Sequence, residues 1–95
     1  MDGRLRNEDA AKRLGRNVFK ARRRAGFSQE ELGGLAGLHR TEISMVESGE
    51  RLPRVDTLLK LASALGVRAE ELLDGIVWII PAPKRPGSFA VSPAE

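Results

Sequence analysis

The sequence predicts a mainly α-helical fold, in which five short helices are followed by a short C-terminal β-strand or hairpin. Three observations lead to this prediction. Apolar residues recur at spacings of three and four, which is the period of one helix face. A glycine follows each of these segments, as at a helix C-cap. The run from Ile76 to Ile80, bounded by Gly75 and Pro81, is instead β-branched and aromatic, which favours a strand.

Length and composition restrict the classes of protein to which the chain can belong. With 95 residues, 41% of them apolar, it is expected to form one domain with a modest core. The absence of cysteine excludes disulfides, cysteine-ligated zinc and thiol catalysis, and a single histidine argues against any metal site. No apolar run is long enough to span a bilayer, and the N-terminus does not resemble a signal peptide. We therefore expect a cytoplasmic protein with no membrane contact.

Positive charge is concentrated at the N-terminal end. Residues 1–27 contain nine lysine and arginine residues against three acidic ones, whereas residues 28–95 contain seven against ten. This distribution suggests a polyanionic partner. It is equally typical of a solvated basic helix face, so charge alone does not decide between the two interpretations.

The first helix is expected over residues 8–25, after a flexible N-terminus at residues 1–7. Leu14 and Val18 belong to its apolar face, and Gly26 ends it.

The second helix carries two signals of its start. Ser28 is a predicted N-cap, and Glu31 completes a capping box with it. Phe27 before the cap and Leu32 after it match a hydrophobic staple.

Three further helices are expected. The third covers about 39–48 and stops at Gly49, the fourth runs from Pro53 to Gly66, and the fifth covers about 69–74. The tail then offers a strand at 76–80, a proline-rich turn and a second strand at 88–91. Because an isolated hairpin is rarely stable in water, this one must pack on the helices, pair with another chain or remain loose.

The segment of residues 28–49 is the most informative part of the chain. Gly33 lies where two helices would approach closely, and Gly37 lies at a sharp turn between them. Gly33 and Gly34 each weaken a helix by about 1 kcal/mol relative to alanine. Close packing would offset that cost at Gly33, whereas Gly34 has no explanation in the sequence. The core positions of the segment are apolar: Leu32, Leu38, Ile43 and Val46. The pattern indicates a helix-turn-helix and therefore sequence-specific DNA binding.

Residues 14–74 resemble the Cro and phage-repressor type of helix-turn-helix domain, the Xre family. The resemblance is carried by RRRAGFSQEEL, AGLHRTEISMVESGERLP and TLLKLASALGV, which occur in the family's order. It implies a five-helix domain at residues 8–75, in which the second and third helices form the DNA-reading unit. It also implies a dimer that binds a two-fold symmetric operator. The tail, residues 76–95, lies beyond the core family domain.

The resemblance implies roles for individual residues. Gln29 matches a glutamine that contacts a phosphate and supports the recognition helix. His39 lies just before that helix, near the DNA backbone. Arg22 and Glu47 match an ion pair between the first and third helices. The outward positions that contact base edges are occupied by Arg40, Thr41, Ser44 and Met45. Gly33 in place of the usual alanine, and the acidic Glu50 after the recognition helix, depart from the pattern.

The chemistry of these residue types suits DNA recognition. The Arg40 guanidinium can donate two hydrogen bonds to guanine, which is worth about 1–3 kcal/mol of discrimination. We favour this base contact over an arginine bonded only to phosphate. Thr41 and Ser44 can donate or accept hydrogen bonds. Met45 either touches a thymine methyl or packs on the core. Phosphate contacts are expected from Gln29, His39, Arg51, Arg54 and Arg23.

Enzymatic function is not expected. The chain has no nucleophile paired with a base and no glycine-rich phosphate loop, and nothing in it implies a cofactor. The leading hypothesis is a bacterial or phage transcription regulator, a repressor that binds double-stranded DNA as a homodimer and joins the nucleoid when bound. The alternative is an antitoxin whose tail binds a protein partner and whose helices repress its own operon.

Two segments are candidates for the dimer surface, and the sequence does not decide between them. The resemblance implies the fifth helix. The strand residues Ile76, Trp78 and Ile80 are the second candidate, because pairing across a two-fold axis would cover an exposed edge. Equally, Trp78 could fold back onto its own domain.

Overall fold

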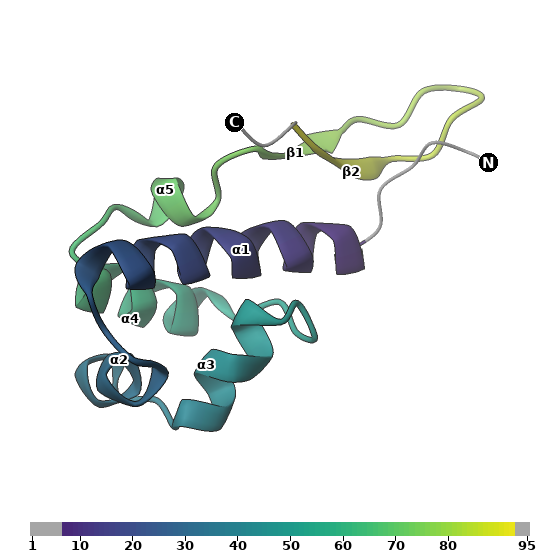
Figure 1. Cartoon of the computed structure of the whole chain (residues 1–95). Helices are drawn as coiled ribbons and strands as arrows, with labels where there is room; N and C mark the ends of the chain where they lie inside the picture. Colours follow the sequence, from purple (N-terminus) through teal and green to yellow (C-terminus); the bar gives the residue numbers. More distant parts are fainter. Residues whose placement is uncertain (1–6, 93–95) are drawn as a thin grey trace.

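The computed structural model describes residues 7–92 of the 95. Five helices form the body of the molecule, and a two-stranded antiparallel hairpin extends from it (Figure 1). This confirms the predicted fold class. The elements in chain order are α1 (Asn7–Ala25), α2 (Gln29–Ala36), α3 (Arg40–Glu47), α4 (Val55–Leu65), α5 (Ala69–Leu72), β1 (Ile76–Ile79) and β2 (Ser88–Val91).

Several element boundaries differ from the prediction by one or two residues; helix α4, for example, begins at Val55 rather than at Pro53. Helix α1 already begins at Asn7, and the rest of the predicted flexible N-terminus, residues 1–6, lies outside the described residues. Helix α5 ends at Leu72 rather than near residue 74, because the amide of Asp74 donates to the carbonyl of Glu71, three residues back, in a turn that leads into β1. Strand β1 ends at Ile79, one residue early.

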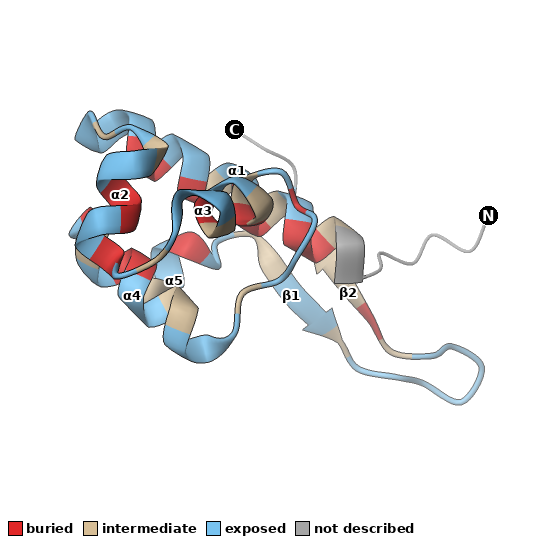
Figure 2. Ribbon diagram, turned by 90° about the horizontal axis from the view of Figure 1, so that it is seen from below, coloured by how far each residue is buried: buried red, intermediate tan, exposed pale blue. Residues whose placement is uncertain are grey.

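One apolar core joins all five helices. Every helix contributes at least one side chain that is almost fully buried (Figure 2). Phe27 packs on this cluster from outside, as expected of a staple residue. The largest fully buried side chains are Leu14, Val18, Leu32, Ile43, Leu61 and Leu72.

Two glycines allow backbones to approach closely. A Cβ at Gly33 would lie 2.6 Å from the carbonyl oxygen of Leu38, in the turn before α3, so the predicted close approach is present. A Cβ at Gly15 would overlap the carbonyl oxygen of Val46, where α1 crosses α3. Sequence reasoning missed Gly15, because a lone glycine inside a helix gives no sign of what crosses it. A Cβ at Gly34 would meet nothing within 4 Å.

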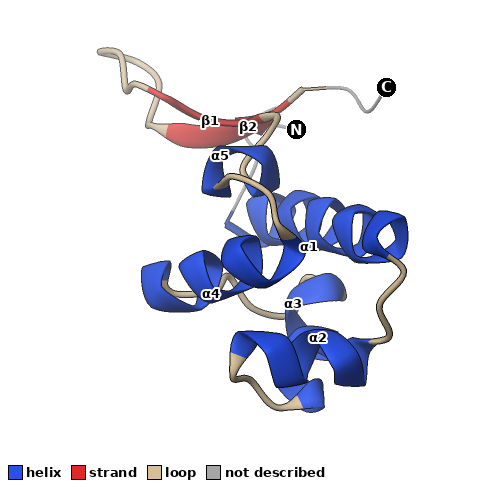
Figure 3. Cartoon of the chain, turned by 90° about the vertical axis from the view of Figure 1, so that its left-hand side faces the viewer, coloured by secondary structure: helices blue, strands red, loops and turns tan. Residues whose placement is uncertain are grey.

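The hairpin packs on α1, on the side opposite α2 and α3 (Figures 1 and 3). The guanidinium of Arg13 donates to the carbonyl of Ser92, and the side-chain amide of Asn17 donates to the carbonyls of Leu72 and Asp74, both at 3.0 Å. Trp78 stacks edge-on against Phe89 of β2, with ring centroids 5.2 Å apart. Of the three possibilities predicted for the hairpin, the structure therefore shows packing on the helices of its own chain.

No helix within the described residues combines the length and apolar character needed to cross a bilayer.

Candidate DNA-binding site

The two helices of the predicted DNA-reading unit are both capped at their starts. The hydroxyl of Ser28 accepts a hydrogen bond from the amide of Glu31 at 3.0 Å, and the Glu31 carboxylate accepts one from the amide of Ser28 at 2.8 Å. This confirms the predicted capping box of α2. The helix ends at Gly37, whose φ of +70° gives the sharp turn that glycine tolerates best.

His39 is the N-cap of α3. Its Nδ1 accepts a hydrogen bond from the amide of Thr41 at 3.1 Å, and the carboxylate of Glu42 accepts one from the amide of His39 at 3.2 Å. Nδ1 can accept only when it carries no proton, so the neutral ring holds its proton on Nε2. That Nε2–H is a free donor on an exposed side chain at the start of α3. The Glu42 capping interaction was not predicted, because histidine is not among the preferred capping residues.

Helix α3 presents a polar face to solvent. Ile43 and Val46 are buried and hold the helix on the core. On the opposite side, Arg40, Thr41 and Ser44 are exposed.

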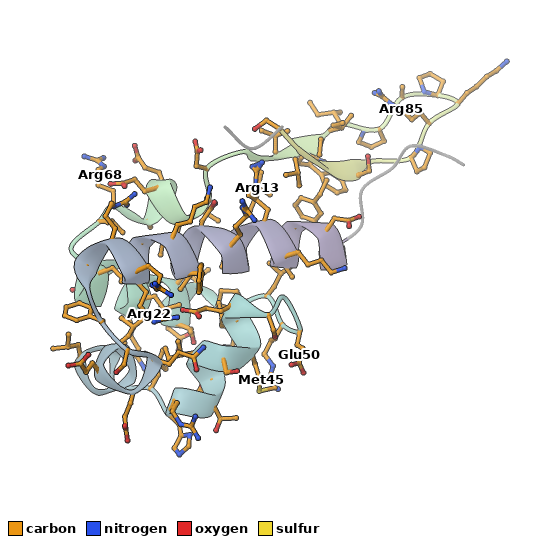
Figure 4. The ribbon with its side chains drawn as sticks, viewed as in Figure 1. Arg13, Arg22, Met45, Glu50, Arg68 and Arg85 are labelled. Carbon is orange, nitrogen blue, oxygen red and sulfur yellow. The ribbon has the colours of Figure 1, made fainter. Side chains whose placement is uncertain are left out.

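Met45 is half-buried and lies where α3 meets the loop to α4 (Figure 4). It lines a hollow of about 360 Å³ together with Arg51, Arg54 and Lys60. The side chain is thus both packed and accessible, and the hollow is lined by acidic groups, Glu42 and Asp56, as well as by these basic ones.

A buried ion pair holds α3 against α1. Arg22 Nε lies 2.6 Å from Glu47 Oε2, and Arg22 Nη2 lies 3.0 Å from Glu47 Oε1, so the contact is bidentate. The Glu47 side chain is only 6% exposed. The hydrogen bond to Glu47 raises the pKa of the Arg22 guanidinium; burial opposes this shift, and the attraction of the carboxylate adds to it. Arg22 therefore stays charged at every pH at which proteins fold.

Glu47 also joins α2 to this contact. The side-chain amide of Gln29 donates to Glu47 Oε1 at 3.1 Å, and Arg22 Nη1 donates to the carbonyl of Phe27 at 2.8 Å. One carboxylate therefore links α1, α2 and α3 near the C-terminal end of α3.

The neighbouring arginines have different surroundings. Arg23 is exposed and its guanidinium lies 5.7 Å from the ring centre of Phe19, a cation–π distance. Arg24 lies 3.8 Å from the Glu71 carboxylate of α5. Arg13 and Arg24 thus extend from α1 toward the hairpin and α5, respectively. The basic residues of the N-terminal third are therefore divided between two faces of the molecule (Figure 4).

The remaining predicted phosphate contacts lie after α3. Arg51 and Arg54 are exposed, and Arg54 is the N-cap of α4. Its guanidinium lies 3.6 Å from Asp56, in an exposed ion pair that costs little to exchange for a phosphate. Within residues 7–92, no cluster of three or more histidine or acidic side chains is placed to hold a metal ion.

Comparison with known proteins identifies the architecture. Residues 18–72 match the model of the helix-turn-helix family HTH_3. The chain belongs to this family. It is 42% identical over 65 residues to the uncharacterised HTH-type transcriptional regulator y4dJ of Sinorhizobium fredii, a match that covers 68% of this chain and 84% of that protein. The expected resemblance to Cro and phage-repressor domains is therefore confirmed, and the chain is a DNA-binding regulator rather than an enzyme.

Two of the solved structures that share this fold are a controller protein and a repressor. The restriction-modification controller protein C.AhdI of Aeromonas hydrophila is 37% identical with a TM-score of 0.64, covering 65% of this chain and 94% of that one. The P22 c2 repressor, crystallised with a synthetic operator, is 31% identical with a TM-score of 0.62 and the same coverages. The family match ends at residue 72, so β1 and β2 lie outside it.

Proposed function

We propose that this protein binds a palindromic DNA operator as a homodimer and represses transcription there. On this proposal it is cytoplasmic and joins the nucleoid when bound. The observation that carries the proposal is the arrangement of α3. Its buried side is held by Ile43, Val46 and the Glu47 ion pair, while its first two turns present polar side chains to solvent. A rigid helix with an exposed polar face is what the major groove admits.

The proposed base contacts follow from the exposed side chains. Arg40 can donate two hydrogen bonds to guanine O6 and N7, Thr41 can offer its methyl to thymine, and Ser44 can donate or accept. The accessible part of Met45 can contact a thymine methyl at the edge of the same face.

The proposed phosphate contacts surround this face. Arg51 and Arg54 would contact the backbone after α3, and the Nε2–H of His39 would contact it before α3. Arg23, which is exposed at the C-terminal end of α1, is a further proposed phosphate contact. Gln29 also holds Glu47, so we assign it a positioning role together with its phosphate contact.

Two relatives support the proposal. The structure of the P22 c2 repressor includes an operator, and C.AhdI is a controller protein. Both are more than 30% identical to this chain over a shared fold.

The test is to select bound fragments from a random DNA pool with the wild type, Arg40→Ala and Arg51→Ala. We expect a palindromic wild-type consensus. Arg40→Ala should relax one base position in each half-site, at a cost of about 1–3 kcal/mol. Arg51→Ala should weaken all sequences alike and lower the slope of log affinity against log salt by about one per subunit. A consensus that does not respond to Arg40→Ala would refute base reading by α3.

The antitoxin alternative has weaker support. It needs a tail that becomes ordered on a protein partner. Here residues 76–91 already form a hairpin held to α1 within a single chain. We therefore do not adopt it as the proposed function.

A further inference from the structure

The outer edge of β1 carries backbone groups that no part of the described chain uses. The amide of Ser92 donates to the carbonyl of Gly75 at 2.8 Å, so these two residues face each other as a hydrogen-bonded pair. Antiparallel pairing alternates, which makes Val77–Ala90 and Ile79–Ser88 the next such pairs. The backbone N–H and C=O of Ile76 and Trp78 therefore point away from β2.

These outward groups are only partly satisfied inside the chain. The amide of Ile76 donates to the carbonyl of Leu73 at 3.1 Å, and Arg85 donates to the carbonyl of Ile80 at 2.9 Å. Among the described residues, the carbonyl of Ile76 and both backbone groups of Trp78 have no partner. By the same alternation, the amide of Ile80 also points outward.

The unpaired backbone groups of β1 are complementary to the same groups on β1 of a second copy. If two β1 strands lie antiparallel with Trp78 on the two-fold axis, each Trp78 amide meets the Trp78 carbonyl of the other copy. Each Ile80 amide then meets the other copy's Ile76 carbonyl. The Ile76 amide and the Ile80 carbonyl also face each other across this pairing, but the chain already satisfies both, through Leu73 and Arg85, so neither needs a partner from the second copy.

We propose that the outer edge of β1 is the dimerisation surface, and that its occupant is β1 of a second copy, paired antiparallel about Trp78 into a four-stranded sheet. This inference rests on the homodimer of the proposed function and names the surface that forms it. It also explains why an uncharged strand edge is left bare, which proteins otherwise avoid.

Side-chain chemistry agrees with this occupant. Val77, Trp78 and Ile80 are 57%, 54% and 72% exposed, although all three are large apolar residues. Residues 75–83 carry no charge, so symmetric pairing brings no like charges together. The competing surface, α5, carries Glu70 and Glu71 in exposed ion pairs with Arg68 and Arg24, so a two-fold axis through it would take charged groups out of water rather than apolar ones.

The position of the hairpin leaves the exposed face of α3 accessible to DNA. The strands lie on the side of α1 opposite α2 and α3 (Figures 1 and 3). A sheet formed through β1 therefore does not cover Arg40, Thr41 or Ser44.

The first test measures mass by sedimentation for the wild type, Trp78→Lys and Leu59→Lys. Leu59 on α4 is 55% exposed, so it is matched to Trp78 in exposure and apolar character. We expect a wild-type dimer, a monomeric Trp78→Lys and a dimeric Leu59→Lys. Helical circular dichroism of Trp78→Lys should equal that of the wild type, because Trp78 contacts its own hairpin and not the helical core.

The second test does not depend on the lysine variant. The chain has no cysteine, so Trp78→Cys introduces a single thiol. Hydrogen-bonded antiparallel pairs have Cα atoms about 5.5 Å apart, within the range of a disulfide. Oxidised Trp78→Cys should therefore run as a covalent dimer, whereas Leu59→Cys should not.

The outcomes distinguish a failure of the β1 dimerisation surface from a failure of the proposed homodimer. A wild-type dimer that survives Trp78→Lys, or that crosslinks through Leu59→Cys, overturns the β1 surface and leaves a homodimeric regulator. A wild type that stays monomeric even on its selected operator overturns both the surface and the homodimer. In that case the edge is open to a strand from a different protein.

Discussion

At the scale of single residues, Glu47 has the most connections. Its carboxylate accepts hydrogen bonds from Arg22 and Gln29, so one side chain joins three helices at the C-terminal end of α3. A buried ion pair is not in itself strongly stabilising, since both charges lose their hydration. Removing one partner is different, because the other is left buried and uncompensated.

We therefore expect Glu47→Ala to lower the free energy of unfolding by about 3–5 kcal/mol. Glu50→Ala should change it by less than about 0.5 kcal/mol, because Glu50 is exposed in the following loop. Denaturant unfolding of the two variants makes the comparison.

A double variant tests the physical reason. Arg22→Met with Glu47→Leu removes both charges and should recover much of the stability lost in Glu47→Ala. Equal unfolding midpoints for Glu47→Ala and Glu50→Ala would show that the ion pair does not support the fold.

At the scale of elements, α2 contains two adjacent glycines with opposite surroundings. Gly33 faces the carbonyl of Leu38 in the turn, with no room for a Cβ, whereas Gly34 faces open space. The sequence predicted the first of these correctly. The structure supplies no packing reason for the second.

This contrast gives a matched pair of substitutions. Gly34→Ala should raise the free energy of unfolding by about 1 kcal/mol, the difference in helix propensity. Gly33→Ala should give no gain, because the new Cβ must displace the backbone of the turn. Thermal melting distinguishes them. A Gly33→Ala protein as stable as Gly34→Ala would mean that the turn adjusts freely.

Most elements could be predicted from local signals. The capping box at Ser28, the glycine ends and the apolar period are properties of neighbouring residues, and they located the helices to within two residues. The histidine cap of α3 and the crossing at Gly15 depend on contacts between distant segments. No local pattern contains that information.

At the scale of the whole molecule, our proposals assign DNA binding to the side of α3 and dimerisation to the side of the hairpin. The resemblance of residues 14–74 to the family predicted the helical side, including the outward residues of α3 and the pairing of Arg22 with Glu47. It did not extend to the hairpin, which lies beyond residue 72. There the sequence left three fates open, because strand pairing and packing on α1 depend on tertiary contacts such as that of Arg13 with Ser92.

The two sides also divide the basic residues. Those near α3, such as Arg40, Arg51 and Arg54, are exposed, whereas Arg13 and Arg24 contact the hairpin and α5. Arg85, in the loop of the hairpin, lies on the side away from α3 (Figure 4). We therefore expect DNA to contact one side only.

The most direct measurement of this central claim is an NMR titration of the isotope-labelled protein with its selected operator. The account predicts that the largest amide shift changes fall at residues 39–45, at the start of α2 and at residues 51–54. The amides of residues 76–91 should change little. Large changes along the hairpin, with residues 39–45 unmoved, would contradict the reading of DNA by α3.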